Sequence, residues 1–203
     1  MLPANDVEEM KTIRLEVTSG ADGFIIQTPE ARKVLELEGV SSEDIFDMPV
    51  WIESKVKRTP ESKSEFRSKM GFSESDFVIS YFGQIEWEEG LSDLASACSL
   101  AIKSNPSLQD KLRVVFSGIG SYAEDLQSQF TLNGCSDLVG YILPTRISHR
   151  ALLAVSDALY ISPLLGRDRI EGEPFRYVTA MTHKIPVLSA RNPVSEYYLG
   201  KHR

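Results

Sequence analysis

Residues that could hold a phosphate or a sugar gather in one segment near the end of this 203-residue chain. Glu171 and Glu173 are followed by Pro174, Phe175 and Arg176, and then by an apolar stretch. Proline suits the first turn of a helix, and a carboxylate just before it lies beside unpaired backbone N–H groups. In an open α/β sheet, such a helix N-terminus is a place where phosphate or sugar hydroxyl groups can be held.

A second segment of this kind begins at Gly83, directly after the apolar run 77–82. It reads Gly-Gln-Ile-Glu-Trp-Glu-Glu-Gly and contains Gln84 and Glu89. A glycine at the carboxyl end of a strand lets a ligand approach the backbone, and the next helix N-terminus favours anions. Its acidic residues have a second interpretation, because glutamates in a first helical turn complement the helix dipole by ~0.3–1 kcal/mol without any function.

Weaker signals lie between these two segments. Gly118 belongs to a lone Gly-x-Gly after the apolar run 112–116, for which turn formation and ligand contact are equally open. Cys98 lies in a helical apolar pattern and Cys135 in a turn, so we expect both to pack rather than to bind metal. The three histidines are far apart in sequence, and we infer no metal site.

Composition excludes several classes of protein. A formal charge of −7 and a pI near 5.1 argue against nucleic acid as the main partner, since phosphate backbones are bound by clustered Lys and Arg. No apolar stretch reaches the roughly 20 residues of a transmembrane helix. The first residues show no signal peptide, and we therefore expect a cytoplasmic protein.

The elements that must position these segments alternate regularly. Apolar runs of strand length are separated by stretches with helical spacing, which predicts an α/β fold: a Rossmann-like parallel sheet with helices on both faces. The polar stretch 55–64 predicts a linker, so we expect 1–52 to end a neighbouring domain and 53–203 to form the Rossmann-like domain. The predicted strands are 23–28, 77–82, 112–116, 137–140, 158–161 and 185–188, and the predicted helices are 5–16, 29–37, 60–70, 91–103, 122–130, 148–156, 174–181 and one from 192.

The run EPFRYVTAM followed by KIPVLSA resembles the signature loop and helix of retaining, nucleotide-sugar-dependent glycosyltransferases of the GT-B fold, family 4, group 1. The chain departs from that pattern at Arg176 and His183, where glycine is usual, and at Thr179, where a second glutamate stands. Taking Glu171 as the first acid restores the usual seven-residue gap to Thr179. The residues that it shares are Glu173, Pro174, Phe175, Ala180, Met181, Pro186 and Val187.

The resemblance implies roles for residues of both segments. Glu173, the catalytic candidate, would contact the sugar hydroxyls, and the backbone N–H groups of Phe175 and Arg176 the sugar or phosphate. Thr179 stands where a carboxylate usually binds the ribose. Gly118 would border the donor pocket, and the backbone at Tyr141 and Ile142 would read the base.

The resemblance also places Gln84 and Glu89 where an arginine and a lysine usually grip the donor diphosphate. A like charge about 4 Å from a phosphate costs roughly 4 kcal/mol at an effective dielectric of about 20. Arg176, Arg167 and Arg169 are candidates to supply the missing cation, and the alternative is that they are arginines of a solvated loop. We expect Gln84 and Glu89 to face the same pocket as the helix that begins at Pro174.

Two functions stay open. The first is transfer of a sugar, with retention and without a metal or other cofactor, from a nucleotide-diphosphate donor to an unknown acceptor. The second is a non-catalytic binding or regulatory module that has lost its diphosphate grip. In both, we expect the N-terminal acceptor domain and the end of the donor domain to be missing from this chain, and we therefore expect the isolated chain to be inactive. Another Rossmann-like nucleotide binder is a third and weaker alternative.

Overall fold

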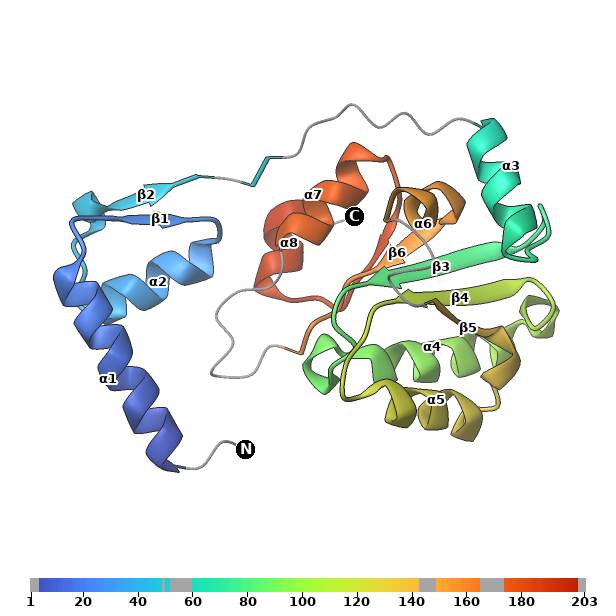
Figure 1. Ribbon diagram of the computed structural model, residues 1–203, viewed down its shortest axis with the longest axis horizontal. Coiled ribbons are helices and arrows are strands. Elements are labelled where there is room, and N and C mark those ends of the chain that lie inside the picture. The colour runs from blue at the N-terminus through green and yellow to red at the C-terminus, as the bar shows by residue number, and fades with distance from the viewer. Residues whose placement is uncertain (1–3, 49, 52–59, 143–148, 165–173, 201–203) are drawn as a thin grey trace.

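The computed structural model describes residues 4–48, 50–51, 60–142, 149–164 and 174–200. Its centre is a parallel sheet of five strands in the order β5-β4-β3-β6-β7 (Figure 1). The strands are β3 (Phe77–Phe82), β4 (Leu112–Ser117), β5 (Val139–Ile142), β6 (Ala158–Tyr160) and β7 (Val187–Leu188). The predicted α/β class, with a parallel sheet, is confirmed.

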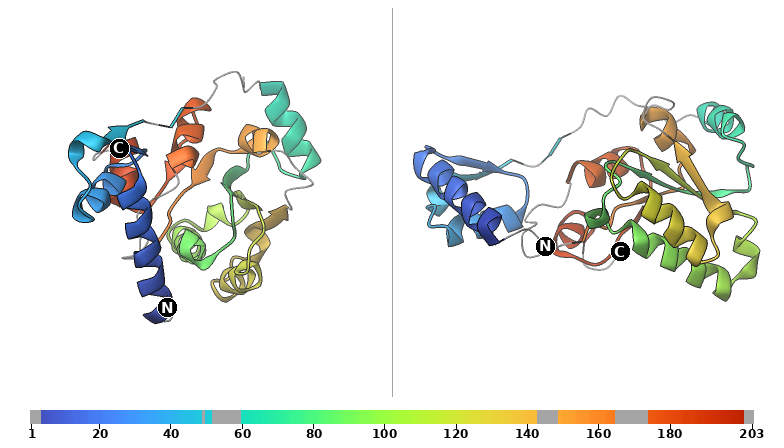
Figure 2. Two further views of the ribbon diagram at one scale, coloured as in Figure 1. Left: turned by 60° about the vertical axis from the view of Figure 1, so that its left-hand side comes forward. Right: turned by 60° about the horizontal axis from the view of Figure 1, so that its bottom comes forward.

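Helices cover both faces of this sheet (Figure 2). Alternate residues of β3 enter different cores: Ile79 and Tyr81 belong to one, Val78 and Phe82 to the other. The first core contains side chains of α4 (Leu91–Ser104) and α5 (Ala123–Leu132). The second contains side chains of α3 (Pro60–Lys69), α6 (His149–Val155), α7 (Pro174–Thr182) and α8 (Pro193–Leu199).

Two strands, β5 and β7, begin two residues later than their apolar runs predict. Ser136–Leu138 forms the 3-10 turn η4, and β5 follows it in register with β4, from Val139 opposite Val114 to Ile142 opposite Ser117. At β7, the N–H of Ile185 donates to Ala180 O at 2.9 Å and so still closes α7. Ile185 is nevertheless buried, which explains why the sequence pattern includes it in the strand.

The N-terminal part forms a smaller unit. It consists of α1 (Ala4–Gly20), β1 (Phe24–Ile26), α2 (Pro29–Leu37), the 3-10 turn η1 (Ser42–Asp44) and β2 (Ile45–Asp47). β1 and β2 pair in parallel, and Ile26 and Ile45 pack with α2 in a small core. On the other face of this pair, Ile25 and Phe46 lie side by side and are 65% and 58% exposed.

Tyr198 of α8 connects this unit to the larger domain. Its hydroxyl donates to Gln27 O at 3.0 Å, just after β1. Its ring stacks on Tyr177 of α7, with the ring centroids 5.7 Å apart and the planes 8° from parallel. The predicted domain boundary at 53 lies outside the described residues.

A buried arginine ties together the amino edge of the sheet. Arg67 of α3 is 2% exposed and pairs with the carboxylate of Asp157, which also accepts from the Val78 N–H and from Lys63 Nζ. Burial opposes ionisation of Asp157, but these hydrogen bonds and the charge of Arg67 outweigh it and lower its pKa. Arg67 also donates to the carbonyl oxygens of Ser73, Glu74, Asp76 and Val155 at 3.0–3.3 Å.

Cys98 and Cys135 are both buried and free, which confirms that they pack in the core. Burial, and secondarily the neighbouring Cys135, raises the pKa of Cys98 to about 12. Among the described helices, none combines the length and the apolar character needed to span a membrane.

Candidate functional site

The strand order places a topological switch between β3 and β6. These strands are neighbours, but the chain leaves β3 toward β4 on one side and β6 toward β7 on the other. Ligands of open α/β sheets bind outside the carboxyl ends of strands at such a switch. The segment 83–90 follows β3 and the helix α7 precedes β7, so both lie beside this switch.

The ends of β3 and β6 are in direct contact. The 3-10 turn η2 (Trp87–Glu89) ends at Gly90, whose carbonyl accepts from the Tyr160 hydroxyl at 2.8 Å. Burial raises the pKa of Tyr160 to about 12, so this hydroxyl stays protonated and donates. A Cβ on Gly90 would lie 2.1 Å from Ser162 O, and the Leu164 N–H donates to Glu88 O at 2.6 Å. The turn η2 is thereby fixed against the end of β6.

Glu89 of η2 and Arg176 of α7 form a buried ion pair across this switch. Arg176 Nη2 donates to Glu89 Oε2, and the two side chains are 1% and 2% exposed. The pair brings the acidic segment after β3 and the first turn of α7 together, as we expect from the parallel strands. It also gives Glu89, which the resemblance places in a lysine position, a cationic partner within the chain.

The environment of the Arg176 guanidinium is closely fitted. Its central carbon lies 5.0 Å from the centroid of the Tyr81 ring, within the range of a cation–π contact. Gly83 has φ +142°, and a Cβ there would lie 3.3 Å from Arg176 Nη1 and 3.0 Å from the Tyr81 hydroxyl oxygen. Gly83 thus leaves room for a side chain of the protein itself. Removing one member of a buried pair typically costs roughly 3–5 kcal/mol.

Gln84 does not take part in this pair. Its side chain is exposed, and its backbone carbonyl oxygen accepts a hydrogen bond from the Tyr81 hydroxyl. Of the two positions that the resemblance assigns to the diphosphate grip, the structure brings Glu89 into contact with α7 and leaves Gln84 at the surface.

The Gly-x-Gly after β4 packs against the segment after β3. A Cβ on Gly118 would lie 1.8 Å from Gly83 O, and one on Gly120 would lie 2.0 Å from Ile85 O. The Gly83 N–H donates to Ser117 O at 3.1 Å, and the Ile85 N–H to Ile119 O at 2.9 Å. Gly118 is therefore needed for close packing against backbone of the chain itself, and its contact with a ligand stays a prediction.

The carboxylate of Glu86, in the same acidic segment, is also hydrogen-bonded to another residue of the chain. Glu86 accepts from the N–H and the hydroxyl of Ser121, two residues before α5 begins. These hydrogen bonds, first that of the hydroxyl, lower the pKa of Glu86. Glu86 and Glu89 therefore each place a carboxylate on a donor that could otherwise bind an anionic ligand.

The remaining candidates in α7 differ in exposure. Phe175 is 52% exposed, whereas Thr179 is 5% exposed, and its hydroxyl oxygen has no hydrogen-bond partner within the described part of the chain. Nδ1 of His183 lies 2.9 Å from Thr179 O. The left-handed backbone conformation that favours glycine occurs at Lys184 (φ 54°), not at His183.

All the ligand-binding roles assigned from the sequence remain predictions, and four of the residues concerned are described only in part or not at all. Tyr141 and Ile142 end β5, two strands away from β3 at the edge of the sheet, and only their backbone position is described. Glu171 and Glu173, which include the catalytic candidate, lie outside the described residues.

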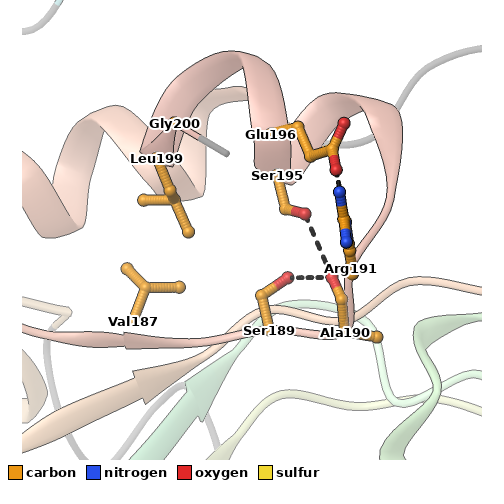
Figure 3. A pocket seen from close by; sticks show the side chains of 8 residues that line it. All are labelled: Val187, Ser189, Ala190, Arg191, Ser195, Glu196, Leu199 and Gly200. Carbon is orange, nitrogen blue, oxygen red and sulfur yellow. Dashed lines mark hydrogen bonds and ion pairs between the residues drawn. The ribbon is translucent and has the colours of Figure 1, made fainter. Parts of the chain in front are cut away.

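A pocket of about 190 Å³ opens at the carboxyl end of β7, beneath α8 (Figure 3). Its serines are turned toward the backbone: the hydroxyls of Ser189 and Ser195 each donate to Ala190 O at 3.0 Å. Arg191 at its rim pairs with Glu196. The polar groups drawn in Figure 3 thus bond to one another.

The described residues also include no group of three or more His, Cys, Asp or Glu side chains that could hold a metal ion.

The sequence analysis did not predict that Glu89 and Arg176 pair with each other. It named Glu89 and Arg176 separately, one as a lost cation and the other as a possible replacement. The available signal was that two departures from the family pattern carry opposite charge and fall in segments expected to face one pocket. Tyr81 gave no signal of its own, because it reads as an ordinary strand residue.

No protein-family model and no curated protein matches this sequence. Solved structures do match. The Anabaena protein HepE, in complex with UDP and glucose, has a TM-score of 0.74 at 18% identity over 90% of this chain and 49% of its own. WaaG, a glycosyltransferase involved in lipopolysaccharide biosynthesis, has a TM-score of 0.71 at 18% identity over 86% and 46%. The pneumococcal O-GlcNAc transferase GtfA, in complex with UDP and GlcNAc, has a TM-score of 0.62 at 14% identity over 89% and 32%.

The chain thus spans about half the length of HepE and WaaG. At these identities the likeness concerns the fold. This chain has the fold of one half of a GT-B glycosyltransferase.

Proposed function

We propose that the chain is the donor-side half of a glycosyltransferase-like protein and serves as a non-catalytic binding or regulatory module. The observation that carries this proposal is the buried pair between Glu89 and Arg176. Arg176, one of the cations that could take over binding of the diphosphate, is already paired with an acid of the chain. Electrostatic stabilisation of a departing diphosphate is usually a large part of catalysis, and here no positive charge is left over from this pair.

Sugar transfer is the second candidate. It is favoured by the fold shared with HepE, a protein solved with UDP and with UDP-glucose. In this candidate Glu173 contacts the donor sugar, the N–H groups of Phe175 and Arg176 contact sugar or phosphate, and Thr179 faces the ribose. Arg176 would then have to exchange the Glu89 carboxylate for a donor phosphate. An acceptor-binding domain would complete the site, as only half of a HepE-sized chain is present.

Calorimetric titration with UDP, GDP and ADP distinguishes the two candidates. A non-catalytic module should bind none of them more tightly than about millimolar, which corresponds to roughly 4 kcal/mol of binding free energy. HepE titrated with UDP under the same conditions is the positive control. Micromolar affinity for one nucleotide, or sugar released or transferred from UDP-glucose by this chain, would exclude the first candidate.

A further inference from the structure

A cavity of about 400 Å³ lies in the N-terminal unit, between the carboxyl ends of α1 and α2. Its position follows from the topology. Each of these helices leads into one strand of the parallel pair β1 and β2, so both end at the amino edge of that pair (Figure 1). Helix carboxyl ends carry a partial negative charge, and the volume is in the range of small-molecule sites, about 300–1,000 Å³.

Several hydrogen-bond donors that line this cavity are already used within the chain. The backbone N–H groups of Glu38, Gly39 and Val40 donate to carbonyl oxygens of α2 at 2.9–3.1 Å. The hydroxyls of Thr18 and Ser19 donate to carbonyl oxygens of α1 at 3.1 and 3.0 Å, which leaves their lone pairs to accept. The cavity therefore favours a ligand that brings donors of its own.

Two carboxylates, those of Glu38 and Asp44, also line the cavity. Glu38 pairs through Oε1 with Arg14 Nε at 2.7 Å, and its buried Oε2 has no hydrogen-bond partner among the described residues. Asp44 is exposed, and its carboxylate has no ion pair or hydrogen bond within the described part of the chain. A cation in the cavity would lower the electrostatic cost of these unpaired oxygens.

Apolar side chains of Leu15, Phe24 and Val40 lie beside these acceptors. We propose that the cavity binds a small primary ammonium ion that carries an aliphatic chain. The ammonium group lies toward Asp44, and the chain packs on the apolar side chains. This inference goes beyond the proposed function and does not depend on it, because the cavity is lined by residues of the N-terminal unit alone.

Hexylammonium chloride, titrated into the isotope-labelled chain and followed by amide NMR, tests the inference. The amide signals of residues that line the cavity should shift together and saturate in the millimolar range. Hexanol and sodium hexanoate carry a similar aliphatic chain without the charge or with the opposite one, and they should bind at least about tenfold more weakly. Hexanol that binds as tightly as hexylammonium would overturn the inference, as would shifts that do not saturate below about 50 mM.

Asp44→Asn removes the unpaired carboxylate. It should weaken the binding of hexylammonium about threefold to fivefold, the range of an exposed ion pair, and the difference should shrink as salt is added. Glu43→Gln is the matched control, because Glu43 belongs to the same turn η1, is also exposed and does not line the cavity. It should change the affinity less than about twofold. Equal effects of the two variants would contradict the assignment of Asp44.

Leu15→Lys supplies an ammonium group that is tethered at the cavity. It competes at a high effective concentration, so the affinity for hexylammonium should fall at least about tenfold. Ile13→Lys adds the same charge to α1 at a position that does not line the cavity and is similarly exposed, 48% against 45% for Leu15. Its affinity should fall less than about threefold. Equal affinities of the two lysine variants would overturn the inference, and this result is independent of the nucleotide titration that tests the proposed function.

Discussion

The pair of Glu89 and Arg176 illustrates how two departures from a pattern become one structural unit. Each alone would be costly, since an isolated buried charge is destabilising. Together they form a buried ion pair between η2 and α7. Their cost and their effect on ligands are therefore properties of the pair, and single substitutions at these positions should be interpreted against a variant that changes both residues.

Gly118 is the position where a single added methyl group should do most damage. A Cβ there would lie 1.8 Å from Gly83 O, so Gly118→Ala must displace one of two hydrogen-bonded loops. We expect it to lower the free energy of unfolding by at least about 2 kcal/mol in urea denaturation. Gly20→Ala is the control, because nothing lies within 4 Å of a Cβ at the end of α1. Equal stability of the two variants would show that the loops adapt freely.

At the scale of elements, the ion-paired centre around Arg67 joins α3, β3 and the end of α6. Asp157→Asn should lower the free energy of unfolding at about pH 7 and make progressively less difference in acid. The pKa of Asp157 is lowered in the fold, so its contribution is present above the unfolded pKa of about 3.9 and is lost as the pH falls through the lower folded value.

Urea denaturation of wild type and Asp157→Asn, from about pH 7 to about pH 2, measures this dependence. The exposed Asp137 provides the control variant Asp137→Asn, which should show little difference at any pH. A difference between wild type and Asp157→Asn that stays constant down to the lowest pH would contradict the expectation.

The sequence predicted elements well where local signals and burial agree. The strand 77–82 and the helix 29–37 have the predicted bounds, because continuous apolar residues mark the first and Pro29 and Gly39 frame the second. Prediction failed at β5 and β7, whose starts depend on pairing with β4 and on the closing bond of α7. Register and side-chain partners arise between distant segments, and the same holds for the ion pair of the candidate site. A one-dimensional pattern does not contain them.

At the scale of the whole molecule, the two-stranded unit at the N-terminus contrasts with the five-stranded sheet. Parallel strands are almost always covered on both faces, yet Ile25 and Phe46 are exposed on one face of the β1 and β2 pair. HepE and WaaG are about twice as long as this chain. The division into 1–52 and 53–203 stays a prediction.

Tyr198→Phe should loosen this unit from the larger domain. It removes the hydroxyl that donates to Gln27 O, a bond worth about 0.5–1.5 kcal/mol, and keeps the ring stacked on Tyr177. Hydrogen exchange followed by mass spectrometry should show faster exchange in β1 and α2 than in the wild type. Tyr197→Phe, at a position 55% exposed, is the control. Unchanged exchange over 24–37 would mean that the contact adds nothing to the protection of the unit.

The glycines after β4 carry a consequence for how such chains change over evolutionary time. Gly118 and Gly120 are required because backbone of the neighbouring loop fills the space beside them. Selection for folding alone therefore retains both, whether or not a nucleotide ever binds. A lineage can lose its substrate and keep this signature unaltered, while the residues that record the loss are charged ones nearby that have acquired new partners. The proposed loss of diphosphate binding is therefore to be tested at Glu89 and Arg176, and not at the glycines.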